Sequence, residues 1–80
     1  MQIPVIKDLV AKYSIDDLKK AEDDLLEEKE LSIEVGGEDE GEQLTHILAA
    51  IWVIHEMDKQ GIPVGKAIRE YTVKVRKSIS

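Results

Sequence analysis

The stretch Glu42–Gln60, EQLTHILAAIWVIHEMDKQ, decides the fold of this chain. Its centre, Ile47–Ile54, is a run of eight apolar residues that contains the only tryptophan. At about 100° per residue, one broad apolar face collects five large side chains. They are Leu44, Ile47, Leu48, Ile51 and Ile54. Because apolar residues also continue around the other side, the stretch predicts a central helix that is packed by neighbours on several sides.

Helical periodicity predicts further helices on both sides of this stretch. Apolar positions recur at helical spacing from residue 3 to 13, from 15 to about 30, and from 64 to the end of the chain. Leu31–Val35 instead alternates apolar and polar residues before a Gly-Gly pair. Such a lone strand either lies extended across the helices or pairs with its copy in a second chain, and we expect 31–37 to be an extended arm. The predicted fold class is all-α, a single helical domain (1–80) of four short helices packed around the central apolar helix at about 42–60.

The same patterns predict helix ends and a core. Ser14 and Asp39 are placed to cap the starts of two helices, and Gly61 is placed to end the central one. The predicted core takes the large residues of each apolar face: Ile6, Leu9, Val10, Leu18, Leu25, Leu44, Ile47, Leu48, Ile51, Ile54, Ile68, Tyr71 and Val75.

Size and composition limit the classes of protein. Eighty residues form one domain, and the absence of cysteine excludes disulfides and thiolate metal sites. The apolar run of eight residues falls far short of the ~20 that span a bilayer. The first ten residues do not have the pattern of a secretory signal. We therefore expect a cytoplasmic protein that has no membrane segment.

The charge is divided unevenly along this acidic chain. The net charge is −6, with −10 over residues 14–42 and +4 over residues 61–80. We expect the basic last helix to lie near the acidic helix, in the same chain or in a partner chain. The acidic helix 16–30 and the basic helix 64–79 are either solvated faces or surfaces for a protein partner. The dominance of acid argues against nucleic-acid binding.

The two histidines are the residues with the most chemistry to offer. On the central helix, His55 falls inside the predicted apolar face, where a buried structural histidine is expected rather than a proton-transfer group. His46 falls on the back with Glu42, four residues before it, and this pair is a weak candidate for two metal ligands. The glycines form no phosphate-binding loop, and a nucleophile elbow is absent. We therefore predict no catalytic residues, no cofactor and no enzyme activity.

Three segments carry a resemblance to a known group of proteins. They are IPVIKDLV (Ile3–Val10), DEGEQLTHILAAI (Asp39–Ile51) and AIREYTVKVRKSI (Ala67–Ile79). Together they resemble a group of short bacterial proteins of uncharacterised function, of the type found in Bacteroidetes and green sulfur bacteria. The resemblance implies a bacterial cytoplasmic origin and carries over no functional residue.

Two functional hypotheses follow from these patterns. The first is a non-enzymatic protein-interaction or regulatory module that works as a homo-oligomer, most simply a homodimer, because a monomeric core of this size is marginal. Its predicted interface uses the small and apolar residues on the back of the central helix and one on the last helix: Ala49, Ala50, Val53, Met57 and Val73. The alternative is a small metal- or ligand-responsive domain that uses Glu42 and His46.

Overall fold

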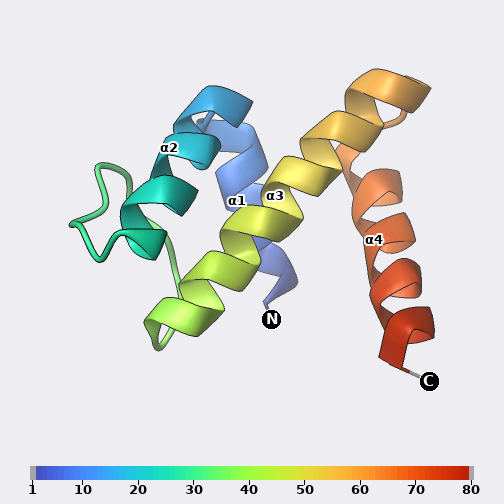
Figure 1. Cartoon of the computed structure of the whole chain (residues 1–80). Helices are drawn as coiled ribbons and strands as arrows, with labels where there is room; N and C mark the ends of the chain where they lie inside the picture. Colours follow the sequence, from blue (N-terminus) through green and yellow to red (C-terminus); the bar gives the residue numbers. More distant parts are fainter. Residues whose placement is uncertain (1, 80) are drawn as a thin grey trace.

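The computed structural model describes residues 2–79, which form four helices (Figure 1). The helices are α1 (Ile3–Lys12), α2 (Ile15–Leu26), α3 (Glu40–Gln60) and α4 (Val64–Ile79). No strand occurs in this described part of the chain, and the all-α prediction is confirmed. α3 begins at Glu40, directly after the predicted cap Asp39 and two residues before the predicted range of about 42–60, and α2 ends at Leu26 rather than near Glu30.

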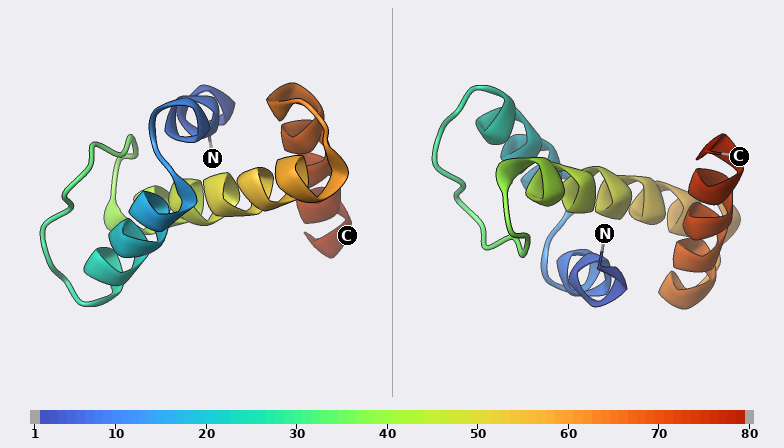
Figure 2. Two further views of the ribbon diagram at one scale, coloured as in Figure 1. Left: turned by 90° about the horizontal axis from the view of Figure 1, so that it is seen from above. Right: turned by 90° about the horizontal axis from the view of Figure 1, so that it is seen from below.

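α3 is the central helix, as predicted, because it contacts each of the other three. α2 lies beside its N-terminal half and α4 beside its C-terminal half (Figure 1). Figure 2 shows α2 and the C-terminal end of α4 on the same side of α3, opposite α1. Within residues 2–79, α2 and α4 do not contact each other. The acidic and basic helices are therefore kept apart within the chain, which leaves a partner chain as the place where they could meet.

The predicted helix ends are confirmed by their hydrogen bonds. The Ser14 hydroxyl accepts from the backbone N–H of Asp17, whose carboxylate accepts from the N–H of Ser14 in return. The Asp39 carboxylate accepts from the N–H of Glu42 at 2.7 Å, which fixes the start of α3. Gly61 ends α3 with φ at 65°, a left-handed conformation that glycine adopts without strain.

The extended arm at 31–37 is also confirmed. Its apolar residues alternate toward the core, with Val35 buried and Leu31 and Ile33 partly buried against it. Where the arm passes α1, a Cβ at Gly36 would lie 3.1 Å from Cγ2 of Val5, so the close approach favours a residue without a side chain. The arm thus covers the core without pairing into a sheet.

The core on α3 is rotated toward the back of the helix relative to the prediction, although Ile47 is buried and Ile51 and Ile54 are partly buried against the core as expected. Ile6, Leu9, Leu18, Ile47 and Ile68 are buried as expected. On α3, however, the fully buried residues are mostly on the side that the sequence analysis placed at the back: His46, Ile47, Ala49, Ala50 and Val53. Leu48, predicted to be in the core, is 45% exposed. The predicted face of α3 was the one with the largest apolar side chains. The other helices instead pack against the face where small residues allow their backbones to approach α3 closely.

No helix within residues 2–79 combines the length and apolar character that a membrane crossing requires.

Candidate interaction surface

His46 is buried and connects three parts of the chain. Its Nε2 accepts a hydrogen bond from the backbone N–H of Gln2 at 2.9 Å, and its Nδ1 lies 2.8 Å from the carbonyl oxygen of Gly36. Because a carbonyl oxygen only accepts, the ring proton is placed on Nδ1. The neutral imidazole therefore ties the start of α1 and the end of the arm to α3.

Glu42 and His46, the two candidate metal ligands, form hydrogen bonds within the chain instead. Both ring nitrogens of His46 are used, and the Glu42 carboxylate accepts from the side-chain amide of Gln2 at 3.4 Å. A metal ion at His46 would have to displace Gln2 or Gly36 from the ring. Across the described residues, no group of three or more His, Cys, Asp or Glu side chains is placed to hold a metal ion.

The buried structural histidine of α3 is His46, and not His55 as had been predicted. His55 was expected to be buried in the apolar face, but its side chain is exposed. The reason is the rotation of α3, whose predicted apolar face is turned partly to solvent. The imidazole that needs hydrogen-bond partners inside the protein is His46, and it has two.

The solvent side of α3 carries an apolar strip, which we call the outer strip. It consists of Leu44, Leu48, Ile51 and His55, spaced 4, 3 and 4 residues apart. This spacing places all four on one line along the helix, as in the contact seam of a coiled coil. Leu48 and His55 are exposed, while Leu44 and Ile51 are partly buried. Leu44, Leu48 and Ile51 were predicted to be core residues, although the same spacing is equally typical of a helix–helix contact between chains.

The overall shape agrees with an uncovered helix face. The Cα trace has a radius of gyration of 12.2 Å, whereas a compact domain of 80 residues has about 11.6 Å. Its accessible surface is 5304 Å², whereas a compact monomer of its 9.0 kDa mass exposes about 4,850 Å². About 450 Å² is therefore exposed beyond the usual amount for a monomer of this mass.

The predicted interface residues divide into two groups. Ala49, Ala50 and Val53 are fully buried inside the chain and cannot reach a partner while the chain keeps this fold. The other helices of the same chain occupy that side of α3. Met57 is partly buried, whereas Val73 is 46% exposed on α4. Of the five, Val73 has the most exposed apolar side chain.

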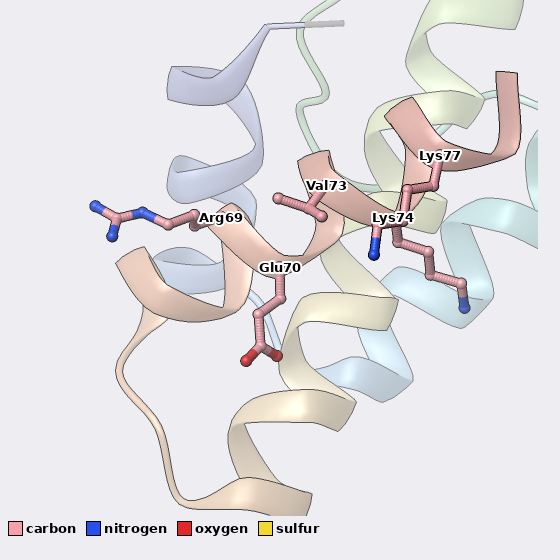
Figure 3. A pocket seen from close by; sticks show the side chains of 5 residues that line it. All are labelled: Arg69, Glu70, Val73, Lys74 and Lys77. Carbon is pink, nitrogen blue, oxygen red and sulfur yellow. The ribbon is translucent and has the colours of Figure 1, made fainter. Parts of the chain in front are cut away.

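Val73 is surrounded by charged side chains on the outer face of α4 (Figure 3). The shallow depression there is lined by five residues of this one helix: Arg69, Glu70, Val73, Lys74 and Lys77. Figure 3 shows Arg69 on one side of Val73 and the two lysines on the other. We call these five residues, with three cations and one glutamate near the valine, the basic patch.

The inner side of α4 is fixed to α3 by aromatic contacts. The rings of Trp52 and Tyr71 lie with their centroids 5.4 Å apart at an interplanar angle of 56°. Lys74 places its ammonium 5.3 Å from the centre of the Trp52 ring, within the range of a cation–π interaction. Burial raises the pKa of the Tyr71 phenol because the anion loses hydration.

A second exposed apolar residue lies at the end of α2. Leu26 is 64% exposed, the largest value among the large apolar residues of the described chain. One turn before it, Glu22 and Asp23 lie on the same side of the helix. Five acidic residues and two lysines give α2 a negative charge, while α4 has five basic residues and one glutamate. We call Glu22, Asp23 and Leu26 the acidic edge.

The whole chain, residues 1–80, matches the model of a protein family described as "Family of unknown function (DUF6952)", and the chain therefore belongs to this family. The family description states no activity, substrate or partner. Searches of the curated proteins and of the solved structures find no match to this chain.

Proposed function

We propose that this chain is a small, non-enzymatic protein-interaction or regulatory module of the cytoplasm that acts as a homodimer through the outer strip of α3. The observation that carries this proposal is Leu48, which is 45% exposed within the apolar run at the middle of the central helix α3. Full burial of a leucine contributes roughly 1.5–3 kcal/mol, and the 45% of Leu48 that stays exposed forfeits about half of that free energy. A second copy of the same strip would cover it.

The dimensions of the chain support an interface of ordinary size. A stable protein–protein contact buries about 800 Å² on each partner, which is about 15% of the 5304 Å² surface of this chain. Leu44, Leu48 and Ile51 form the apolar centre that such a contact needs, and exposed polar residues surround them. A two-fold axis across α3 would pack the strip against its own copy, so that each residue contributes twice.

Sedimentation equilibrium from micromolar to millimolar concentration tests the proposal. We expect a reversible dimer for the unmodified chain. Leu48→Glu places a charge in the contact twice, and should weaken dimerisation by at least about a hundredfold, about 2.8 kcal/mol. The control is Ala11→Glu, which adds the same charge at an exposed position on α1, away from the strip.

Two results would contradict the proposal. The mass of one chain at all concentrations would exclude self-association. A dimer that survives Leu48→Glu and is lost with Ala11→Glu would place the contact on α1 instead. Far-UV circular dichroism of both variants checks that each keeps its helices, so that a loss of dimer is not a loss of fold.

A further inference from the structure

We infer that, in the dimer, the basic patch on α4 of one copy docks against the acidic edge on α2 of the other copy. This inference rests on the proposed self-association and adds the orientation of the two chains. Each surface has one exposed apolar residue, Val73 or Leu26, on a helix whose net charge is positive for α4 and negative for α2. The two surfaces are thus complementary in charge and alike in having an apolar centre.

The first argument is that the two surfaces do not meet within one chain. α2 and α4 are separated by α3, and no contact joins them in the described residues. Opposite charges at this separation are screened at physiological salt, where the Debye length is about 8 Å. The net negative charge of α2 and the net positive charge of α4 are therefore not set against each other within one chain.

The second argument is the position of α2 and α4 along α3. α2 accompanies the N-terminal half of α3 and α4 its C-terminal half (Figure 1). The side of α3 opposite α1 has α2 at one end and the C-terminal end of α4 at the other (Figure 2). If two copies pack their outer strips antiparallel, the N-terminal half of one α3 lies over the C-terminal half of the other. This orientation brings α2 of one copy to the end of the dimer where the partner has α4.

A parallel pairing would give the opposite electrostatics. It would bring α2 to the end where the partner also has α2, and α4 to the end where the partner has α4. Like charges would then oppose each other at both ends, which destabilises a contact. The division of charge between the two helices, five acids on α2 and five bases on α4, therefore favours the antiparallel orientation.

Charge exchange on the two surfaces tests the orientation. The first variant, Glu22→Lys with Asp23→Lys, makes the acidic edge basic. The second variant, Arg69→Glu with Lys77→Glu, makes the basic patch acidic. In the antiparallel dimer each variant alone opposes like charges at two symmetric contacts, and we expect dimerisation at low salt to weaken by at least about tenfold. An equimolar mixture of the two variants restores opposite charges at both contacts and should dimerise like the unmodified chain.

The outcomes separate this inference from the proposal on which it rests. If the unmodified chain is a monomer throughout, the proposed self-association fails and the orientation falls with it. If the unmodified chain dimerises and neither variant alone weakens the dimer, self-association stands and the docking of α4 on α2 is wrong. Thermal melting of each variant, followed by circular dichroism, checks that the exchanged charges leave the fold intact. Weakening in both variants with recovery in the mixture supports the inference.

Discussion

Replacement of His46 by alanine is the sharpest test of the packing around α3. The ring is fully buried and makes hydrogen bonds of 2.9 Å to the N–H of Gln2 and 2.8 Å to the carbonyl of Gly36. Each such bond contributes about 1 kcal/mol net, so their loss costs about 2 kcal/mol. The cavity left by the ring raises the total to about 3 kcal/mol or more. Domains of this size have only about 4–12 kcal/mol in all.

His55→Ala is the matched control, because it makes the same change on the same helix at an exposed side chain. Exposed substitutions usually stay within about 0.5 kcal/mol. Urea unfolding, followed by the fluorescence of Trp52 at one low protein concentration, measures both free energies of unfolding. In thermal melts, His46→Ala should lower Tm by at least about 12 °C, since 1 kcal/mol corresponds to about 4–8 °C here.

The tautomer of His46 gives a second, independent readout. Nitrogen NMR of the side chain should show the proton on Nδ1, because the Gly36 carbonyl accepts there and Gln2 donates to Nε2. A larger loss of stability for His55→Ala than for His46→Ala would refute the orientation of α3. It would instead support the original interpretation of the sequence, in which His55 was buried.

Three further predictions concern stability. Ile47→Ala should lower the free energy of unfolding in urea by about 2–5 kcal/mol because Ile47 is fully buried. Leu48→Ala, one residue later but at a side chain that is 45% exposed, should lower it by under about 1 kcal/mol in the monomer. Equal losses would contradict the assignment of Ile47 to the buried face of α3 and Leu48 to the exposed one. Gly61→Ala should cost about 1 kcal/mol because φ is 65°, whereas Gly65→Ala, whose Cβ would meet no atom within 4 Å, should be neutral or stabilising. Burial raises the pKa of Tyr71, so the folded state holds this proton more tightly, and the free energy of unfolding should fall as pH rises above about 10 through the folded-state pKa. Tyr71→Phe should remove this part of the fall, and an unchanged slope would show that the phenol is not responsible.

The fold was predictable from local signals that agree with one another. Ser14, Asp39 and Gly61 are residue types with a strong preference for helix ends, and each ends or begins a helix where expected. The alternation in Leu31–Val35 identified an arm with one side on the core. Such signals depend on backbone conformation within a few residues, so a single sequence contains them in full.

The orientation of α3 was not predictable in the same way. Large apolar residues occur on most of the circumference of α3. Which of its sides is buried therefore depends on where the three other helices contact it and not on the sequence of α3 alone. The small residues Ala49 and Ala50 let those helices approach, and that approach turned Leu48 toward solvent. The hydrogen bonds of His46 depend on Gln2 and Gly36, which are 44 and 10 residues away in the chain. No periodicity within α3 encodes these partners.

The central claim, that the outer strip of α3 faces a second copy of the chain, is tested most directly by isotope-filtered NMR. A one-to-one mixture of labelled and unlabelled chain separates contacts between copies from contacts within one. We predict nuclear Overhauser effects from the methyl groups of Leu48 and Ile51 in the labelled copy to the outer strip of the unlabelled copy. Intermolecular effects that arise only from another face, or none at millimolar concentration, would contradict the claim.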